Sequence, residues 1–458
     1  MKRPLGGADW DIILGYTCRV RVIHLFDACG VTADCVEELS SPPTSTVSIF
    51  PKLSELSIFR LGKKIIPFLQ HLTGPRLTDL KLNHPYEVED AISTFGEKCP
   101  NITTFEYRPS AATENPNMLS RLISQWPKLR SMYCQYARSL NAVARTHLSH
   151  IHNLHSLKLE LLDEMVDLSS PSILTFPALL HCELHARSLD TIRRFFDPCR
   201  LSVIEQLNFE LLILPAEPEL QSFLAALTDA CNHDSLSGFK LGIPIYVDPV
   251  PPYHINFHHL CPLTVFTNIQ SIDLTIPWAM DLSEQEILHL TSSWPRLEVL
   301  ILGGNGVMHH TTLGGITPGG FVQLLEQCRS LSRFSFTFDT GGYTDIPQGH
   351  PWHGLDMPED TEICVHHSAI EEESVEALGT FFHAAPFPKF KLVFGNGHED
   401  GRLYREPLNL YWDRWKRVHS LAQNLWEERE TSFHSLSQGQ SAVHSDGHGS
   451  DSSDTGVN

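Results

Sequence analysis

The sequence predicts an α/β solenoid, in which short parallel strands alternate with outer helices along the chain. Three observations support this fold class. A leucine-rich frame recurs about every 25 residues in the central part of the chain. Apolar and polar residues alternate inside each copy of the frame, and apolar residues between the copies have the spacing of helices. One such unit cannot bury its apolar face alone, so neighbouring units must stack.

The recurring frame is Leu, two residues, Leu, one residue, Leu, often with proline two places before the first Leu. We name the first apolar position of each copy its anchor. The positions three and five residues after the anchor are apolar in every copy, whereas among the positions four residues after it only Ile301 is plainly apolar. This alternation predicts a short strand after each anchor, with one buried face and one solvent-facing face. The anchors are Val20, Leu53, Leu77, Ile102, Leu129, Leu154, Leu179, Ile204, Leu236, Ile269, Leu297 and Leu331.

The segments between the strands are predicted to be helical, because their apolar residues recur every three or four positions. This spacing is clearest in residues 88–95, 189–196, 223–227, 287–290 and 321–325. Proline cannot continue a helix and favours an extended residue before it, so the recurring prolines should end the helices and lead into the strands. The prolines in such positions are Pro100, Pro127, Pro177 and Pro295.

The same patterns predict the domain boundaries. Residues 340–372 are rich in glycine, proline and acidic residues, which is typical of an inserted loop. Residues 431–458 have almost no apolar residues, so burial cannot offset the conformational entropy lost when this segment becomes ordered. The amphipathic stretch from Leu408 to Glu430 is predicted to cover the end of the solenoid, and the alternative is a docking helix for a partner. We expect a lead-in over residues 1–19, the solenoid over residues 20–339, an insertion loop over residues 340–372, a last repeat-like unit with the capping helix over residues 373–430, and a disordered tail over residues 431–458.

Composition argues against several classes of partner and compartment. The chain has 34 basic and 54 acidic residues and a formal net charge of -20, so a nucleic acid or an anionic membrane surface would be repelled. No apolar run approaches the ~20 residues that span a bilayer, and no secretory signal follows Met1. The cysteines lack C-x-x-C spacing, as expected of buried thiols in a reducing compartment. We therefore expect a soluble protein of the cytoplasm, the nucleus or both.

No motif predicts catalysis, a cofactor or a metal site. The histidines include three adjacent pairs and the group His147, His150, His152 and His155, but none has zinc-site spacing such as H-E-x-x-H. No G-x-S-x-G elbow is present, and the glycine-rich residues 303–320 lack the Gly-Lys-Ser/Thr ending of a phosphate loop. The sequence therefore predicts a protein that is not an enzyme, without catalytic residues, cofactor or metal.

The solvent-facing side of the strands is the candidate binding surface. In such a solenoid the strands line the concave side, so their polar positions form one array of side chains. Mixed charge with an aromatic residue suits recognition of a polar protein segment, and the alternative is that these residues only keep the face soluble. The predicted protein-binding residues are Asp79, Lys81, Glu106, Arg108, Tyr133, Lys158, Glu160, Glu183 and His185.

These features resemble a known family. The repeats resemble those of F-box/leucine-rich-repeat proteins, and the order of segments is similar to that of the fungal, basidiomycete group of F-box proteins. The resemblance extends roughly from Arg3 to Glu430, and its motifs are residues 3–10 with 16–21, residues 361–370 and residues 411–418. It implies a leucine-rich-repeat horseshoe whose concave face recognises the protein substrate of an SCF-type cullin-RING ubiquitin ligase.

The chain departs from this family in two respects. Many leucine-rich repeats have Asn eight residues after the anchor, whereas here only Asn305 and Asp339 are polar in the expected way, so we expect irregular repeats. The family's F-box, which docks on the adaptor of the cullin-RING ligase, usually precedes the repeats, but only about twenty residues precede the first predicted strand.

Two explanations of the missing F-box are open. Either it is absent from a truncated product or gene model, or this member has lost the module. The loss favours a ligase-independent interaction scaffold. An enzyme or enzyme activator built on the same repeats would need a catalytic constellation, which the sequence does not contain.

Overall fold

The computed structural model shows two compact units, which are described separately. Unit 1 comprises Met1–Asp281 and Ser292–Val307, and unit 2 comprises Leu282–Thr291 and Met308–Asn458. The structure describes residues 5–26, 33–42, 48–59, 66–83, 95–108, 118–135, 142–161, 173–243, 254–276, 278–303, 315–344, 352, 355, 358, 361–365, 368–385, 391–393 and 406–443.

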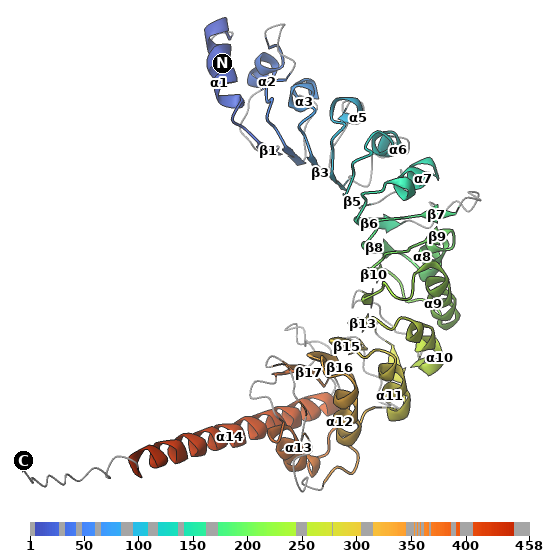
Figure 1. Ribbon diagram of the computed structural model, residues 1–458, viewed down its shortest axis with the longest axis vertical. Coiled ribbons are helices and arrows are strands. Elements are labelled where there is room, and N and C mark those ends of the chain that lie inside the picture. Colours follow the sequence, from blue (N-terminus) through green and yellow to red (C-terminus); the bar gives the residue numbers. More distant parts are fainter. Residues whose placement is uncertain are drawn as a thin grey trace, which may run out of the picture. The chain divides into compact units, whose positions relative to one another are not determined.

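Unit 1 is built on a parallel β-sheet whose strands follow one another in chain order. In Figure 1 the strands of unit 1 line the inner side of the ribbon and the helices lie on the outer side. Two short strand pairs lie outside this sheet, β7 (Leu174–Thr175) with β9 (Cys199–Arg200) and β12 (His254–Asn256) with β14 (Ala279–Asp281). The sheet strands are β1 (Val22–Phe26), β2 (Glu55–Phe59), β3 (Asp79–Asn83), β4 (Thr104–Arg108), β5 (Ser131–Cys134), β6 (Ser156–Leu161), β8 (His181–Ala186), β10 (Gln206–Leu211), β11 (Gly238–Gly242), β13 (Ser271–Thr275) and β15 (Val299–Leu302).

The helices of unit 1 agree with the predicted segments where these are described. α8 (Leu189–Phe196) coincides with a predicted helix, and the Ser188 side chain caps it by accepting a hydrogen bond from the Thr191 amide. α9 (Glu217–Ala230) contains residues 223–227, and of residues 88–95 only Phe95 is described, at the start of α5. The other helical elements are α1 (Gly7–Thr17), α2 (Ala33–Leu39), α3 (Ile66–Leu72), α5 (Phe95–Lys98), α6 (Met118–Ile123), α7 (Ala142–His150), α10 (Phe257–Leu260) and the 3-10 helix η3 (Cys261–Val265).

The strand positions confirm the predicted register and fold class. Each sheet strand of unit 1 begins two residues after its anchor, from Val20 and β1 to Leu297 and β15. In unit 2 the same offset separates Leu331 from β16 (Arg333–Ser335). Parallel strands at this repeat, joined by helices on one side, make the chain an α/β leucine-rich-repeat solenoid.

The core of unit 1 lies between the sheet and the helices and consists of stacked apolar columns. Phe209 of β10 is 1% exposed and occupies the centre of an aromatic cluster. Its ring centroid lies 5.6 Å from Phe196 of α8, 5.1 Å from Phe223 of α9 and 5.9 Å from Phe239 of β11. Such contacts join the helices to the sheet and to the neighbouring repeat.

A hydrogen-bond ladder at the start of the strands holds neighbouring repeats in register. The carbonyl group of the residue after each anchor accepts two backbone N–H groups of the next repeat. Thr78 O accepts from Thr103 N and Thr104 N at 2.8 and 3.0 Å, and the same double contact recurs through unit 1 from Arg21 to Gln270. Where the residue after the anchor is Ser or Thr, its hydroxyl donates a further hydrogen bond to the same carbonyl of the preceding repeat. Thr103 Oγ1, for example, donates to Thr78 O at 3.2 Å.

Pro51, Pro75 and Pro295 lie in turns that start the strands. The anchor N–H of Leu53, Leu77 and Leu297 donates to the carbonyl three residues before it, at 3.1 Å in each case. The proline two residues before the anchor is therefore the second residue of a four-residue turn, a position that suits its fixed φ. Proline here does more than end the preceding helix, because it also sets where the next strand begins.

Unit 2 contains the last described repeats. Its strands β16, β17 (Glu362–Cys364) and β18 (Lys391–Val393) pair in parallel in that order. Its helices are α11 (Glu284–Ser292) and α12 (Pro318–Gln327), which contain residues 287–290 and 321–325, α13 (Ser374–His383) and α14 (Glu406–Val443). None of the helices that the structure describes is both long and apolar enough to cross a membrane.

α14 packs on α13 through a buried tryptophan. Trp415 is 1% exposed, and its Nε1 donates to the Ser368 carbonyl oxygen at 2.9 Å. Its ring centroid lies 6.1 Å from Phe338 and 6.4 Å from Phe382 of α13. At Gly379 of α13 an added Cβ would lie 2.9 Å from Leu421 Cβ, so the glycine lets the two helices approach closely.

Two predicted boundaries in unit 2 are wrong. β17 lies inside the predicted insertion loop of residues 340–372, where Ile363 is fully buried between half-buried neighbours. Three residues are too short an alternation to stand out in a segment rich in glycine, proline and acid. α14 continues to Val443, into the predicted disordered tail of residues 431–458, because extending an existing helix needs much less local preference than nucleating one. The rest of that tail, residues 444–458, lies outside the described part of the chain.

Replacing Thr103 by Val tests the hydroxyl part of the ladder. The substitution keeps the side-chain shape and removes the hydrogen bond to the Thr78 carbonyl, so we expect the free energy of unfolding to fall by about 0.5–1.5 kcal/mol. Urea unfolding followed by circular dichroism measures it. Thr104→Val is the matched control, because the Thr104 hydroxyl bonds to no other described residue. Equal losses in the two variants would contradict the role of the hydroxyl.

Candidate functional site

The side of the sheet that faces away from the helices carries three rows of side chains in unit 1. Parallel pairing places equivalent positions of neighbouring strands side by side, so the residues two, four and six places after the anchors form a first, a central and a third row. The polar column of the sequence is thus one continuous row in space. The central row is His24, Ser57, Lys81, Glu106, Tyr133, Lys158, Glu183, Asn208, Lys240, Asp273 and Ile301.

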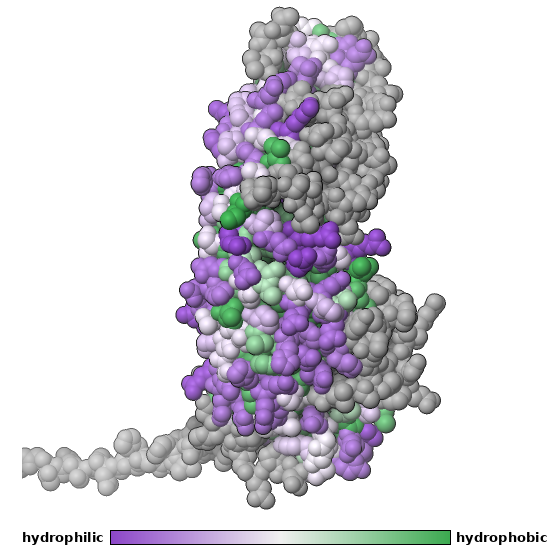
Figure 2. Space-filling view, turned by 90° about the vertical axis from the view of Figure 1, so that its right-hand side faces the viewer, coloured by the Kyte–Doolittle hydropathy of each residue, from purple (hydrophilic) through white to green (hydrophobic). Residues whose placement is uncertain are grey.

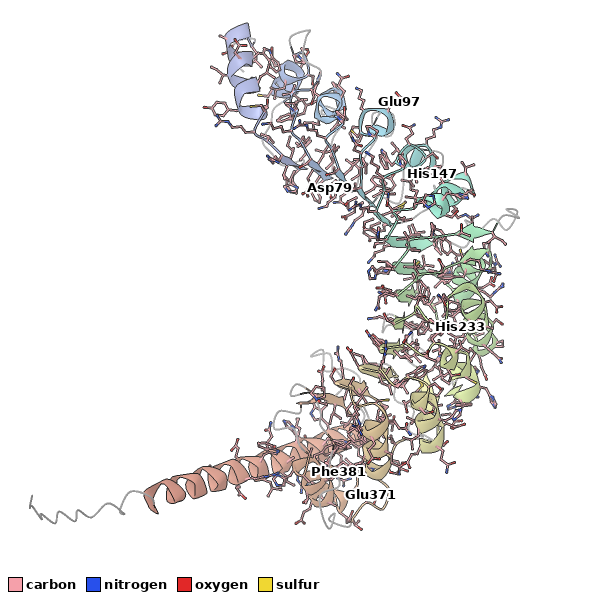
Figure 3. All side chains as sticks on the ribbon, in the orientation of Figure 1. Asp79, Glu97, His147, His233, Glu371 and Phe381 are labelled. Atoms are coloured by element: carbon pink, nitrogen blue, oxygen red, sulfur yellow. The ribbon has the colours of Figure 1, made fainter. Side chains whose placement is uncertain are left out.

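All nine predicted residues lie on this face, on the neighbouring strands β3, β4, β5, β6 and β8. Figure 3 shows Asp79 on the strand side of unit 1, whereas Glu97 and His147 lie on the helix side. The structure therefore brings the predicted set together on one surface. Asp79 is in the first row, Lys81, Glu106, Tyr133, Lys158 and Glu183 are in the central row, and Arg108, Glu160 and His185 are in the third row.

The cations of this face are paired with carboxylates of the same face. Lys81 Nζ lies 3.0 Å from Glu55 Oε1, and Lys158 Nζ lies 2.6 Å from Glu183 Oε1. The same arrangement recurs where Arg108 Nε lies 2.6 Å from Glu106 Oε1 and where Lys240 Nζ lies 3.2 Å from Asp273 Oδ2. These groups are partly exposed, so each pair contributes only about 0–1 kcal/mol to stability. Their larger effect is that the surface neutralises its own charge.

His185 extends this network toward β10. Its Nε2 lies 2.6 Å from Glu183 Oε1, and its Nδ1 lies 3.1 Å from Glu210 Oε2. Burial alone would raise the pKa of the Glu183 carboxyl, but the hydrogen bonds from Lys158 and His185 outweigh burial and hold this pKa below its ordinary value. Glu183 therefore remains ionised and paired at neutral pH.

Tyr133 lies between two cations from the strands on either side of β5. Arg108 Cζ of β4 lies 4.8 Å from the centroid of the Tyr133 ring, and Lys158 Nζ of β6 lies 5.0 Å from it. Burial raises the pKa of the Tyr133 hydroxyl, although the two cations act in the opposite direction. The phenol is therefore neutral at physiological pH and can both donate and accept a hydrogen bond.

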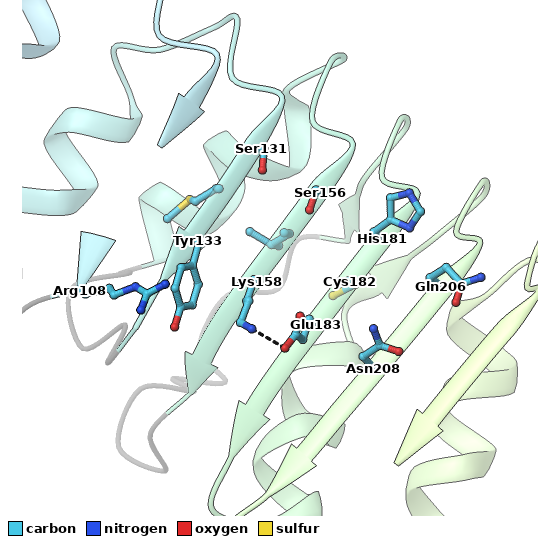
Figure 4. A pocket seen from close by; sticks show the side chains of 12 residues that line it. Arg108, Ser131, Tyr133, Ser156, Lys158, His181, Cys182, Glu183, Gln206 and Asn208 are labelled. Carbon is cyan, nitrogen blue, oxygen red and sulfur yellow. Dashed lines mark ion pairs between the residues drawn. The ribbon is translucent and has the colours of Figure 1, made fainter. Parts of the chain in front are cut away.

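A hollow of about 430 Å³ opens on this face over strands β4 to β10 (Figure 4). Met132, Leu157 and Cys182 also border it, although their side chains are buried at 1% exposure. Four predicted residues line it, Arg108, Tyr133, Lys158 and Glu183, and the prediction missed other polar residues beside them. Four of the missed residues are polar residues two places after their anchors, and the fifth, Asn208, lies four places after its anchor in the central row. The missed residues are Ser131, Ser156, His181, Gln206 and Asn208.

The histidine group at the end of α7 makes local contacts. His150 Nδ1 donates to the Thr146 carbonyl oxygen at 2.7 Å, and His155 Nδ1 donates to the Asn153 carbonyl oxygen at 2.5 Å. Within the described part of the chain, no three His, Cys, Asp or Glu side chains are placed to hold a metal ion. The adjacent histidine pairs at residues 309–310 and 366–367 lie outside the described residues.

The helix side of the chain offers a different surface. Figure 2 shows it as mainly hydrophilic, with small hydrophobic areas between the polar residues. Val143 of α7 and Val265 of η3 are examples of such exposed apolar residues, at 67% and 40% exposure. Single exposed apolar residues are common on soluble proteins and need no partner.

Comparison with known proteins yields likenesses in structure alone. No family model matches the chain, and no curated protein matches it. The chain is similar to a chain in the crystal structure of the Rad7 and Elc1 complex in yeast, with 15% sequence identity and a TM-score of 0.32, over 77% of this chain and 83% of that chain. It is also similar to a chain of the TLR13-ssRNA13 complex, with 12% identity and a TM-score of 0.30, over 76% of this chain and 58% of that chain, less than two thirds of its length. Likenesses of this degree carry no conclusion about function.

Replacing Lys158 by Met tests the electrostatics of the central row. A carboxyl whose pKa is lowered in the folded state stabilises the fold above its unfolded pKa, near the ordinary value of 4.5, and this contribution is lost as the pH falls through the folded pKa. Removing the Lys158 hydrogen bond should therefore raise the pKa of Glu183, which carbon-13 NMR of labelled glutamate measures. Lys240→Met, which breaks the pair with Asp273 instead, should leave the Glu183 titration unchanged. If the pKa of Glu183 changes in neither variant, the pairing of Lys158 with Glu183 is contradicted.

Proposed function

We propose that this protein is a non-catalytic recognition module whose strand face in unit 1 binds a protein segment. The observation that carries the proposal is the continuous central row with its hollow of about 430 Å³ over β4 to β10. Partly buried polar side chains surround an aromatic residue, Tyr133, and an arginine, Arg108. Tyr and Arg are among the residues that most often anchor protein interfaces.

The charge pattern supports a protein rather than a phosphate-rich partner. Binding to a nucleic acid depends on free cations that replace the counterions of the phosphates. The lysines of the central row, Lys81, Lys158 and Lys240, already have carboxylate partners, and the net charge of the whole chain is -20. Binding of a polar protein segment does not require free cations on the surface.

By resemblance, the proposal extends to substrate recognition in an SCF-type cullin-RING ubiquitin ligase. The strand face would hold the substrate non-covalently, an F-box would bind the ligase adaptor, and proximity would allow modification by other subunits. Two of the segments that resemble the fungal F-box group, residues 361–370 and 411–418, contact each other in unit 2. Trp415 Nε1 donates to the Ser368 carbonyl oxygen, and Arg414 Nη1 donates to the Ile370 carbonyl oxygen at 2.6 Å. These hydrogen bonds place the two segments side by side in unit 2.

A ligase-independent interaction scaffold is the second candidate function. The observation that favours it is that the strand face and its hollow lie on unit 1 alone, so binding of a partner there needs no ligase subunit. The same strand face would then bind a partner that is not delivered to a ligase.

Reversing three charges of the central row tests the proposed surface. We expect Lys81→Glu, Glu106→Lys and Lys158→Glu together to abolish co-purification of protein partners with the full chain. The melting temperature should change little, because each disrupted pair is worth only about 0–1 kcal/mol. Glu97→Lys, Lys98→Glu and Arg121→Glu on α5 and α6 change the net charge by the same amount on the helix side and should leave the partners bound. Partners that survive the central-row changes would show that this face is only a solvated surface.

Co-purification of the cullin-RING adaptor separates the two candidate functions. The full-length gene product should recover the adaptor if it acts in a ligase, under conditions in which a known F-box protein does so. The central-row variant should recover the same amount, because the adaptor would bind the F-box and not the strand face. Failure of the full-length product to recover the adaptor would rule out the ligase role and leave the scaffold.

A further inference from the structure

We infer that the hollow over β4 to β10 binds an extended protein segment with uncharged polar side chains and little net charge. The inference rests on the proposed function and specifies the class of segment that the strand face takes. It follows from a contrast inside the hollow, where the charged groups have partners and several uncharged polar groups have none among the described residues.

The charged groups of the hollow are already neutralised. Arg108 pairs with Glu106 and Lys158 pairs with Glu183, each at 2.6 Å. An acidic segment would have to compete with these carboxylates, and a basic segment would have to compete with the two cations. Either exchange leaves a charge of the protein unpaired in a partly buried position, so a charged ligand gains little from these groups.

The serine, histidine and amide side chains of the hollow are available for hydrogen bonds. The side chains of Ser131, Ser156, His181 and Asn208 form no hydrogen bond with any residue that the structure describes. Gln206 donates from Nε2 to Ser237 Oγ at 3.0 Å and keeps its Oε1 free of any described donor. These groups offer both donors and acceptors, which match the backbone and the Ser, Thr, Asn or Gln side chains of a bound segment.

The free groups form a line across the strands. Ser131, Ser156, His181 and Gln206 are neighbours in register on β5, β6, β8 and β10. Four strands at a spacing of ~4.8 Å span about 14 Å, the length of about four residues of extended chain. A segment in this line therefore lies across the strands, along the first row.

The line ends where Gln206 meets the next strand. At Gly238 of β11 an added Cβ would lie 2.0 Å from Gln206 Oε1, so the amide occupies the space of the missing side chain. Ser237, the neighbour of this glycine, accepts the hydrogen bond from the same amide. The Gln206 side chain therefore marks the β11 end of the segment.

Selection of peptides from a display library of random linear sequences on the full-length protein tests the inference. We expect the selected peptides to be rich in Ser, Thr, Asn and Gln and to carry little net charge. Their affinity should change less than about twofold when the salt rises from ~0.1 M to ~1 M, a change that shortens the Debye length from ~10 Å to ~3 Å. Fluorescence anisotropy with labelled synthetic peptides measures both properties.

Two variants locate the binding. Ser156→Arg fills the middle of the line and should weaken the peptides at least about tenfold, and Asn208→Ala removes one hydrogen-bonding group and should weaken them about two- to tenfold. Ser271→Arg is the matched control, because Ser271 occupies the same row on β13 outside the hollow and should have no effect. Circular dichroism confirms that each variant is folded, and Asn208→Ala keeps the test valid if Ser156→Arg does not fold.

The possible outcomes separate this inference from the proposed function. Neutral, salt-insensitive peptides that respond to Ser156→Arg or Asn208→Ala and not to Ser271→Arg support it. Strongly charged peptides that lose affinity as salt rises, but still respond to changes in the central row, overturn the inference and leave the proposed function standing. Peptides that respond to no change on the strand face, or the absence of any selected peptide, overturn both.

Discussion

The double hydrogen bond to the carbonyl after each anchor is the interaction on which the rest of unit 1 depends. Two N–H groups of one repeat meet a single carbonyl of the repeat before it, from Arg21 to Gln270. A slip by one residue would break both bonds and turn the apolar side chains of the strand toward water. The three rows, their ion pairs and the hollow all exist because this register is kept from strand to strand.

Local signals in the sequence explain why so much of the fold was predictable. Alternation over five residues and a proline turn before the anchor are both encoded within one repeat, so each strand could be placed independently. β17 was missed because its three residues, with only Ile363 fully buried, lie in a segment whose composition is typical of loops. The end of α14 was missed because propagation of a helix depends on the helix already formed and not on the local composition.

The candidate surface was predictable as a face but not as a set of contacts. Register makes Lys81 the neighbour of Glu106 in the central row, yet Lys81 pairs with Glu55 of the first row. Glu106 pairs instead with Arg108, two residues further along its own strand. These choices depend on side-chain rotamers, which the repeat pattern does not encode. The uncharged residues of the hollow were missed for a related reason, since a prediction based on charge overlooks serine and glutamine.

The turn before each anchor also bears on how such a chain can change in evolution. The distances between successive anchors are unequal, although the strand that follows each anchor begins two residues after it, from β1 to β16. Each repeat therefore resets its own alignment, and residues gained or lost in one connection do not propagate to the next strand. The connecting segments are free to diverge in length and composition while the arrangement of the strand face is conserved.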